Sequence, residues 1–268
     1  MNTGRKGPED LWGARTSPGP GETQRVDAGP LRIWLRRVEN EIWLTYARAD
    51  HHGSELAESP DEDADWSRWA LRDEPRHLRI TPVFPDRSLV VKPEFPFTLL
   101  RRARARVYMR VPVWVRVEAV EEARSKALLL TEIPTEVLSE TWWGDFLEGE
   151  IAYWLTTKAR RGLRPDHFEP HLVMSTLQLS NLSEDDLRVE KLSLRVEHLS
   201  IYQKDGWLWA EEVRVDYHGD AEGSEIHMDD APPEEAEGAT EISPPRFQAK
   251  SLSARTFARL RALSGFGQ

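Results

Sequence analysis

Eighteen consecutive residues from Arg101 to Glu118 alternate between two kinds of side chain, in the sequence RRARARVYMRVPVWVRVE. One face of this run would carry Val107, Met109, Val111, Val113, Val115 and Val117. The opposite face, called here the arginine face, would carry Arg102, Arg104, Arg106, Tyr108, Arg110, Trp114 and Arg116. A period of two with β-branched residues predicts a strand with one face in the core. Because strands usually have about five or six residues, we expect Pro112 to mark a bulge, a bend or an edge position.

The rest of the central region also reads as short strands separated by turn residues. The runs LRIWLRRV and EIWLTYA flank Glu39-Asn40, and Asp205-Gly206 separates two apolar runs, which predicts two hairpins. These patterns predict an all-β fold, either a β-sandwich or two packed β-sandwich units. We place this domain at residues 29–219, with a candidate sub-boundary near residues 160–170.

Composition shifts predict three segments outside that domain. Residues 1–28 are rich in Gly, Pro and Ser, without an apolar period, and are expected to be disordered. Residues 220–245 are expected to be an acidic disordered linker, because Asp220 to Glu241 holds nine acids and no Lys or Arg. Residues 246–268 read as a cationic amphipathic tail with a short helix. Its predicted interaction residues are Arg255, Phe257, Arg259, Leu260 and Leu263.

Several classes of function have no support in the sequence. Cysteine is absent, which excludes disulfides and thiolate metal sites. Phosphate-loop, zincin, serine-hydrolase and dinucleotide motifs do not occur. The stretch DHFEPH holds His167 and His171, but Pro170 prevents the helix that would place both on one face. We therefore expect no cofactor and no metal. The chain has no apolar leader and no transmembrane run, so we expect a soluble, cytoplasmic protein.

The stretch IPTEVLSETWWGDFLEGEI, residues 133–151, supports two interpretations. Asp145, Glu148 and Glu150 resemble the carboxylates of a glycoside hydrolase, with Trp142 and Trp143 as sugar platforms. Such chemistry usually draws its carboxylates from different strands, whereas here they lie in one local run. We therefore favour a turn, in which the glycines permit positive φ and the tryptophans cover one end of the core.

The arginine face also has two interpretations. Arginines interleaved with Tyr108 and Trp114 are typical of surfaces that bind single-stranded nucleic acid, and anionic lipid headgroups suit them equally. The alternative is pairing with Glu and Asp on neighbouring strands, which contributes about 0.2–1 kcal/mol for each pair. Both interpretations stay open at the level of sequence.

Three segments resemble an uncharacterised prokaryotic family, domain of unknown function 432. They are PTEVLSETWWGDFLEGEIAYWLTTKARR, LQLSNLSEDDLRVEKLSLRVEHLSIY and GWLWAEEVRV. The resemblance covers residues 75–218 and extends to the tail, while the N-terminus and the long acidic segments look like additions. It implies no catalytic residue. Members are sometimes encoded near small mechanosensitive channels, which implies a membrane protein as partner.

Together these features predict a non-enzymatic, β-rich binding module. Its expected partner is a protein, and an accessory role beside a membrane protein such as a mechanosensitive channel fits the resemblance. An anionic surface or single-stranded nucleic acid is the expected ligand if the arginine face binds. The alternative function is a carbohydrate-active or hydrolytic enzyme that uses Asp145, Glu148 and Glu150.

Overall fold

The computed structural model describes residues 11–13, 15–49, 56–72, 75–121, 127–144, 146–147, 149–164, 168–219, 223–248 and 253–254. The predicted tail residues Arg255, Phe257, Arg259, Leu260 and Leu263 lie outside these ranges, as does the helix expected there. The fold is all-β, as predicted: strands β1 to β21 are joined by loops and by the short 3-10 turns η3 (Val196–His198) and η4 (Glu234–Ala236). In the described ranges, no helix has the length and apolar character that a membrane span requires.

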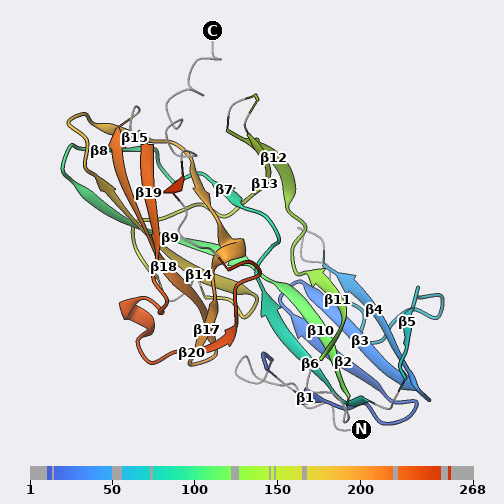
Figure 1. Cartoon of the computed structure of the whole chain (residues 1–268). Coiled ribbons are helices and arrows are strands. Elements are labelled where there is room, and N and C mark those ends of the chain that lie inside the picture. The colour runs from blue at the N-terminus through green and yellow to red at the C-terminus, as the bar shows by residue number, and fades with distance from the viewer. Residues whose placement is uncertain are drawn as a thin grey trace.

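The strands form two stacks of sheets that lie end to end (Figure 1). The first stack contains two four-stranded sheets. One sheet has the order β1-β6-β10-β11, with bounds Arg15–Thr16, Pro75–Val83, Trp114–Glu121 and Leu128–Pro134. The other has the order β2-β3-β4-β5, with bounds Thr23–Ala28, Leu31–Val38, Glu41–Arg48 and Ser67–Ala70. The Glu39-Asn40 hairpin is confirmed between β3 and β4, where Glu39 has a φ of 50°.

The second stack is built on the path β20-β17-β18-β14-β9, with β19 beside β18 and β21 beside β19. Their bounds are Thr240–Ser243, Ile201–Lys204, Trp207–Gly219, Leu172–Asn181, Arg104–Pro112, Gly223–Met228 and Ser253–Ala254. Two smaller sheets complete the stack, with orders β12-β13-β7-β16 and β15-β8. Their bounds are Ser139–Trp143, Glu150–Trp154, Leu89–Val91, Leu192–Leu194, Leu187–Val189 and Phe97–Leu99. The Asp205-Gly206 hairpin is confirmed between β17 and β18, with φ angles of 50° and 80°.

The eighteen-residue alternating run belongs to both stacks. Strand β9 pairs with β14 in the second stack, and β10 pairs with β6 and β11 in the first. Pro112 ends β9 and Val113 lies between the two strands, so the chain leaves one sheet and enters the other without reversing. The predicted inward face is confirmed, because its six members are all at most 1% exposed: Val107, Met109, Val111, Val113, Val115 and Val117.

The expectation of disorder over residues 1–28 is corrected by the described part of this segment, 11–13 and 15–28, while residues 1–10 and 14 lie outside the described residues. Strands β1 and β2 lie within it, and Trp12 is 4% exposed, with its indole N–H donating to the carbonyl oxygen of Pro170 at 2.7 Å. Strand β2 pairs along its whole length with β3. Main-chain hydrogen bonds make such a ladder without an apolar period in the added strand, which explains why composition did not reveal it.

The expectation of a disordered acidic linker over residues 220–245 is corrected by its described part, residues 223–245. It contributes β19, η4 and β20, and pairs with β18 and β17. Ala236 of η4 is fully buried. Main-chain pairing and the carboxylate contacts of Glu235 with Arg106 and Tyr108 hold a polar sequence in place.

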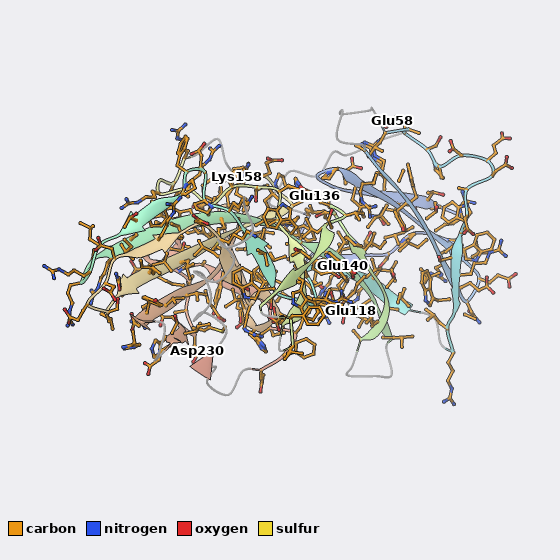
Figure 2. All side chains as sticks on the ribbon, turned by 90° about the horizontal axis from the view of Figure 1, so that it is seen from above. Glu58, Glu118, Glu136, Glu140, Lys158 and Asp230 are labelled. Carbon is orange, nitrogen blue, oxygen red and sulfur yellow. The ribbon has the colours of Figure 1, made fainter. Side chains whose placement is uncertain are left out.

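A single apolar core runs through both stacks, and Val113 and His171 lie where the stacks meet. The main chain of Val113 donates to the carbonyl oxygen of His171 at 3.0 Å and accepts from the N–H of Thr135 at 3.1 Å. The His171 side chain lies against Gly29 of the β2–β3 turn, and its Nε2 is 3.0 Å from Oε1 of Glu136. Seen from above, Glu136 lies between the part that carries Glu58 and the part that carries Asp230 (Figure 2). The imidazole therefore fills the space between the stacks.

Glu211 on β18 gives a testable pH dependence. The side chain is 5% exposed, and burial, with the nearby carboxylates of Asp230 and Glu241, raises its pKa above the ordinary 4.5. A folded-state pKa above the unfolded value favours folding below the unfolded pKa, and this contribution is lost as pH rises through the folded pKa. We expect Glu211→Gln to raise the Tm at neutral pH and to flatten the gain in stability that the native protein shows on acidification.

Thermal unfolding at a series of pH values measures this effect. Glu237→Gln, at an exposed position on the same surface, is the matched control. An equal change in Tm for Glu211→Gln at every pH would show that burial of the charge is not the cause.

Candidate interaction site

Strands β12 and β13 form a hairpin that projects from the second stack (Figure 1). Trp142 pairs with Ile151, and Trp143 pairs with Glu150. Because successive side chains point to opposite faces of a strand, Trp142 and Ile151 share one face, and Trp143 lies on the other. The expected turn in this stretch is confirmed. The expectation that both tryptophans cover the core is half wrong, since Trp143 is 4% exposed and Trp142 is 50% exposed.

The outward side and the tip of this hairpin carry a concentration of exposed apolar side chains. Phe146 and Leu147 at the tip are 92% and 88% exposed, and Ile151 beside Trp142 is 49% exposed. We call these four residues the hairpin patch. Isolated exposed apolar residues are ordinary, whereas a group of them on one projecting element is typical of an interaction site. Burial against a partner would contribute about 1.5–3 kcal/mol for a fully buried side chain of this size.

The base of the hairpin is firmly held on its inner face. Trp143 packs with Val90 and Ala152 in a buried cluster, and Trp154 packs against it. On the opposite face, which Tyr153 shares with Trp142 and Ile151, the Tyr153 hydroxyl donates to Oδ1 of Asp86 at 3.0 Å. Burial, with this hydrogen bond, raises the pKa of Tyr153. The hairpin patch is therefore presented by a strand pair that is anchored on its inner face by Trp143 and on its outer face by Tyr153.

A polar network anchors the start of β13. Oε1 of Glu150 is 3.2 Å from a guanidinium nitrogen of Arg195 and 3.3 Å from Oγ of Ser88. The same Ser88 oxygen lies 3.1 Å from Oε1 of Glu197, whose pKa is raised by burial. Glu150 is thus held by protein partners, while Asp145 and Glu148, its companions in the hydrolase interpretation, lie outside the described residues.

The arginine face on β9 contacts carboxylates that come from the acidic segment and from β18. Arg106 lies 3.0 Å from carboxylate oxygens of both Glu212 and Glu235. The Tyr108 hydroxyl donates to Glu235 at 2.7 Å, and burial with this hydrogen bond raises the pKa of Tyr108 to about 12. Arg110 pairs with Glu169 at 3.3 Å.

The remaining members of the arginine face lie at its two ends. Arg116 pairs with Glu132 at 2.7 Å, and the guanidinium of Arg246 lies 5.2 Å from the centroid of the Trp114 ring. Arg102 pairs with Glu184 at the other end, near the exposed Arg104. Carboxylates thus contact Arg102, Arg106, Arg110 and Arg116. The structure supports internal pairing for this face, and its binding of a polyanion stays a prediction.

In the described part of the chain, His171 has a structural role. Its Nε2 faces Glu136, and Asp166 and His167 lie outside the described ranges. Among the residues that the structure describes, no group of His, Asp or Glu could hold a metal ion.

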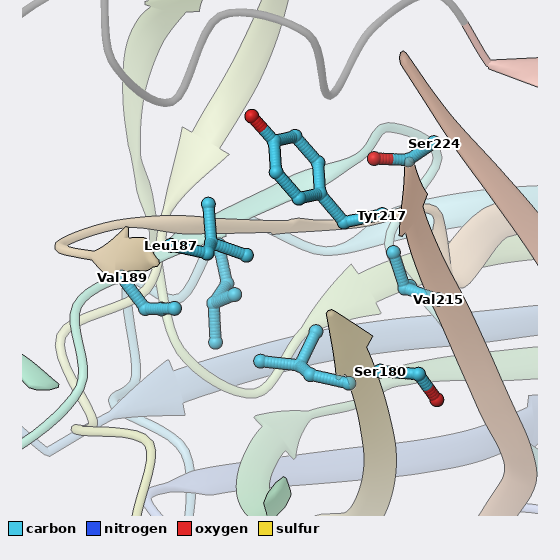
Figure 3. Close-up of a pocket in the computed structure, with 8 residues that line it drawn as sticks. Ser180, Leu187, Val189, Val215, Tyr217 and Ser224 are labelled. Carbon is cyan, nitrogen blue, oxygen red and sulfur yellow. The ribbon is translucent and has the colours of Figure 1, made fainter. Parts of the chain in front are cut away.

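A small cavity lies between the sheets of the second stack (Figure 3). It is lined by Leu179, Ser180, Leu187, Val189, Leu192, Val215, Tyr217 and Ser224. Its volume of about 10 Å³ is comparable to the space that one water molecule needs. No carboxylate lines it, so this cavity offers neither the room nor the groups for hydrolysis of a sugar.

Comparison with known protein families identifies the family of the chain. A family model described as a protein of unknown function, DUF432, matches residues 11–261. The chain belongs to the DUF432 family. The match extends well beyond the 75–218 expected from sequence, so the acidic segments and residues 11–28 of this DUF432 protein are part of the family pattern and not additions. Neither a curated protein nor a solved structure matches the chain significantly.

Sequence reasoning on this DUF432 chain found the stretch that contains the hairpin but missed the hairpin patch itself. The stretch was singled out for its carboxylates and paired tryptophans, whereas the structure emphasises Phe146 and Leu147. A signal was present, since two large apolar residues stand between Gly144 and Gly149 in a segment already interpreted as a turn. Large apolar side chains at the centre of a turn have no neighbouring strand to cover them.

Proposed function

We propose that the chain is a non-enzymatic, cytoplasmic interaction module that binds a protein partner through the hairpin patch. One observation carries this proposal: Phe146 and Leu147, neighbours in the sequence at the tip of a projecting hairpin, are 92% and 88% exposed. Trp143 is buried on the inner face of the same hairpin, whereas exposure of Phe146 and Leu147 to solvent adds nothing to the stability of the fold. Their exposure is explained by a partner that covers them.

The charges around the hairpin patch indicate the chemistry of the partner. Glu140 and Glu150 on the strands already pair with Arg87 and Arg195, whereas Asp145 and Glu148 flank the two apolar residues in the sequence. The two acids beside the apolar residues repel an anionic membrane surface and attract Lys and Arg. The complementary surface is an apolar protein patch with a basic rim. The resemblance given above makes the cytoplasmic part of a membrane protein the first partner to test.

Photo-crosslinking from two positions tests the proposal. A photo-reactive phenylalanine analogue at position 146 is expected to crosslink one protein in the native host cell. The same analogue at Phe95, which is 76% exposed but lies on another loop, is the matched control. Identical crosslinked products from both positions, or no product from position 146, would contradict the proposal.

A pair of variants then tests the energetic contribution of the hairpin patch to binding of the crosslinked partner. The double substitution Phe146→Ser and Leu147→Ser is expected to weaken binding at least a hundredfold with little change in the Tm, because both side chains are largely exposed. Phe95→Ser is expected to change neither property. Retained affinity in the double variant would place the interface elsewhere on the molecule.

A further inference from the structure

Three lysines lie side by side across neighbouring segments of the second stack. Strands β7 and β16 are antiparallel, with Leu192 opposite Val91, so the next position of this register places Lys191 beside Lys92. On the other side, Pro93 and Ala159 form a parallel bridge, which places Lys158 beside Lys92. The main-chain N–H of Ala159 donates to the carbonyl oxygen of Lys92 at 3.0 Å and fixes this arrangement. Lys158 is labelled in Figure 2.

An aromatic ring contacts two members of this lysine row. The ammonium nitrogens of Lys92 and Lys191 lie 5.4 Å and 5.9 Å from the centroid of the Trp154 ring. Both distances are within the range of a cation–π contact, which contributes about 0.5–1 kcal/mol at an exposed site. Trp154 itself packs on the buried cluster of Val90, Trp143 and Ala152. The ring therefore gathers two ammonium groups on a rigid support.

The row has positive charge without a matching carboxylate. The salt bridges of the described residues include none to Lys92, Lys158 or Lys191. The acids that follow Lys92 and precede Lys191 along the chain are already engaged: Glu94 pairs with Arg160 at 3.4 Å, and Glu190 pairs with Arg188 at 2.7 Å. Like charges directly opposite on neighbouring strands are destabilising. The three ammonium groups repel one another, and a bound anion would relieve this repulsion.

We infer that Lys92, Lys158 and Lys191, supported by Trp154, form a binding site for a phosphate group. Three ammonium groups supply several hydrogen-bond donors, and Lys serves as a point charge for phosphate. A phosphate monoester or diphosphate carries enough charge to neutralise two or three lysines. The group is either the headgroup of a phospholipid or a soluble phosphate compound. This site is separate from the hairpin patch and does not depend on the function proposed for it.

Binding of inorganic pyrophosphate by the full chain, measured by calorimetry at low ionic strength, tests the inference. Cosedimentation with phosphatidylcholine vesicles, with and without phosphatidylglycerol, forms the second arm. Binding in the first arm alone assigns a soluble phosphate compound, and binding that requires phosphatidylglycerol assigns a lipid headgroup. Absence of wild-type binding in both arms, including a result in which only single-stranded DNA binds, would overturn the inference.

Two triple variants locate the binding. Lys92→Gln, Lys158→Gln and Lys191→Gln together are expected to weaken the affinity at least tenfold, equivalent to about 1.4 kcal/mol. Arg72→Gln, Arg101→Gln and Lys204→Gln remove the same net charge from other parts of the surface and are expected to have less than a twofold effect. An equal loss of affinity in both triple variants would show that binding depends on net charge alone, and it would contradict the proposed site.

Discussion

Replacing Gly29 with alanine is expected to lower the free energy of unfolding by about 2–5 kcal/mol, because backbone strain and a steric clash act together. Gly29 has a φ of +61°, in the left-handed region that favours glycine. A Cβ built on it would lie 2.1 Å from Nδ1 of His171, whose ring is buried between the two stacks. The ring cannot move without giving up Glu136, so the contact between the stacks must open to admit the methyl group.

Chemical denaturation measures this loss, and two further variants separate its causes. Gly21→Ala has a similar φ of +76° with no atom within 4 Å of the added Cβ, so it reports the backbone cost alone. Adding His171→Ala to the Gly29→Ala chain is expected to recover part of the loss that the clash causes. If Gly29→Ala and Gly21→Ala prove equally stable, the contact with His171 is not tight.

Replacing Arg246 with alanine is expected to cost about 1.5–3 kcal/mol, the range for hydrogen bonds to charged groups, because the ion pair is partly buried and Glu132 keeps Arg116 as a partner. The Arg246 side chain is 12% exposed and lies 2.7 Å from Oε2 of Glu132, which is 15% exposed. Its Nε donates to the carbonyl oxygen of Phe84, and its guanidinium lies over Trp114. One side chain thus fastens the segment after β20 to the first stack, and its loss leaves Glu132 with Arg116 alone.

Arg214→Ala is the matched control for Arg246→Ala. Arg214 pairs with Asp229, but its side chain is 50% exposed, and such surface pairs contribute about 0–1 kcal/mol. The free energy of unfolding of both variants follows from denaturant titration. Similar values for the two would mean that the contacts of Arg246 are no more valuable than those of a solvated ion pair.

Local features of the fold could be predicted because their causes are local. Asp205-Gly206 requires two positive φ angles, which few residue pairs other than Asn-Gly and Asp-Gly accept. The alternation from Val107 to Val117 likewise follows from the period of a strand. The exchange of sheets at Val113 has its cause elsewhere, in β6, β11 and β14, which are distant in sequence and supply the two sets of partners.

The candidate site was harder to predict because it too depends on residues that are distant in sequence. Adjacent tryptophans must point to opposite faces of a strand, but only the position of β12 within its sheet decides that Trp143 is the buried one. The arginine face looked available because its main partner, Glu235, lies in a segment whose composition indicates disorder. The charges of the arginine face and of Glu235 indicate that these groups attract each other. They do not indicate that main-chain pairing of the acidic segment brings them into contact.

The strand that serves both stacks has a consequence for synthesis on the ribosome. The first stack needs residues up to Pro134, and the second begins at Leu89 and ends with strands near the C-terminus. Neither stack is therefore a continuous length of chain that completes its folding before the next begins, as separate domains commonly do during translation. Before β17 to β20 are synthesised, the second stack is incomplete. Strand β9 then extends from the folded first stack, and its inward face, which carries Val107, Met109 and Val111, is uncovered. The nascent chain then exposes apolar surface of the kind that favours aggregation until the last strands emerge.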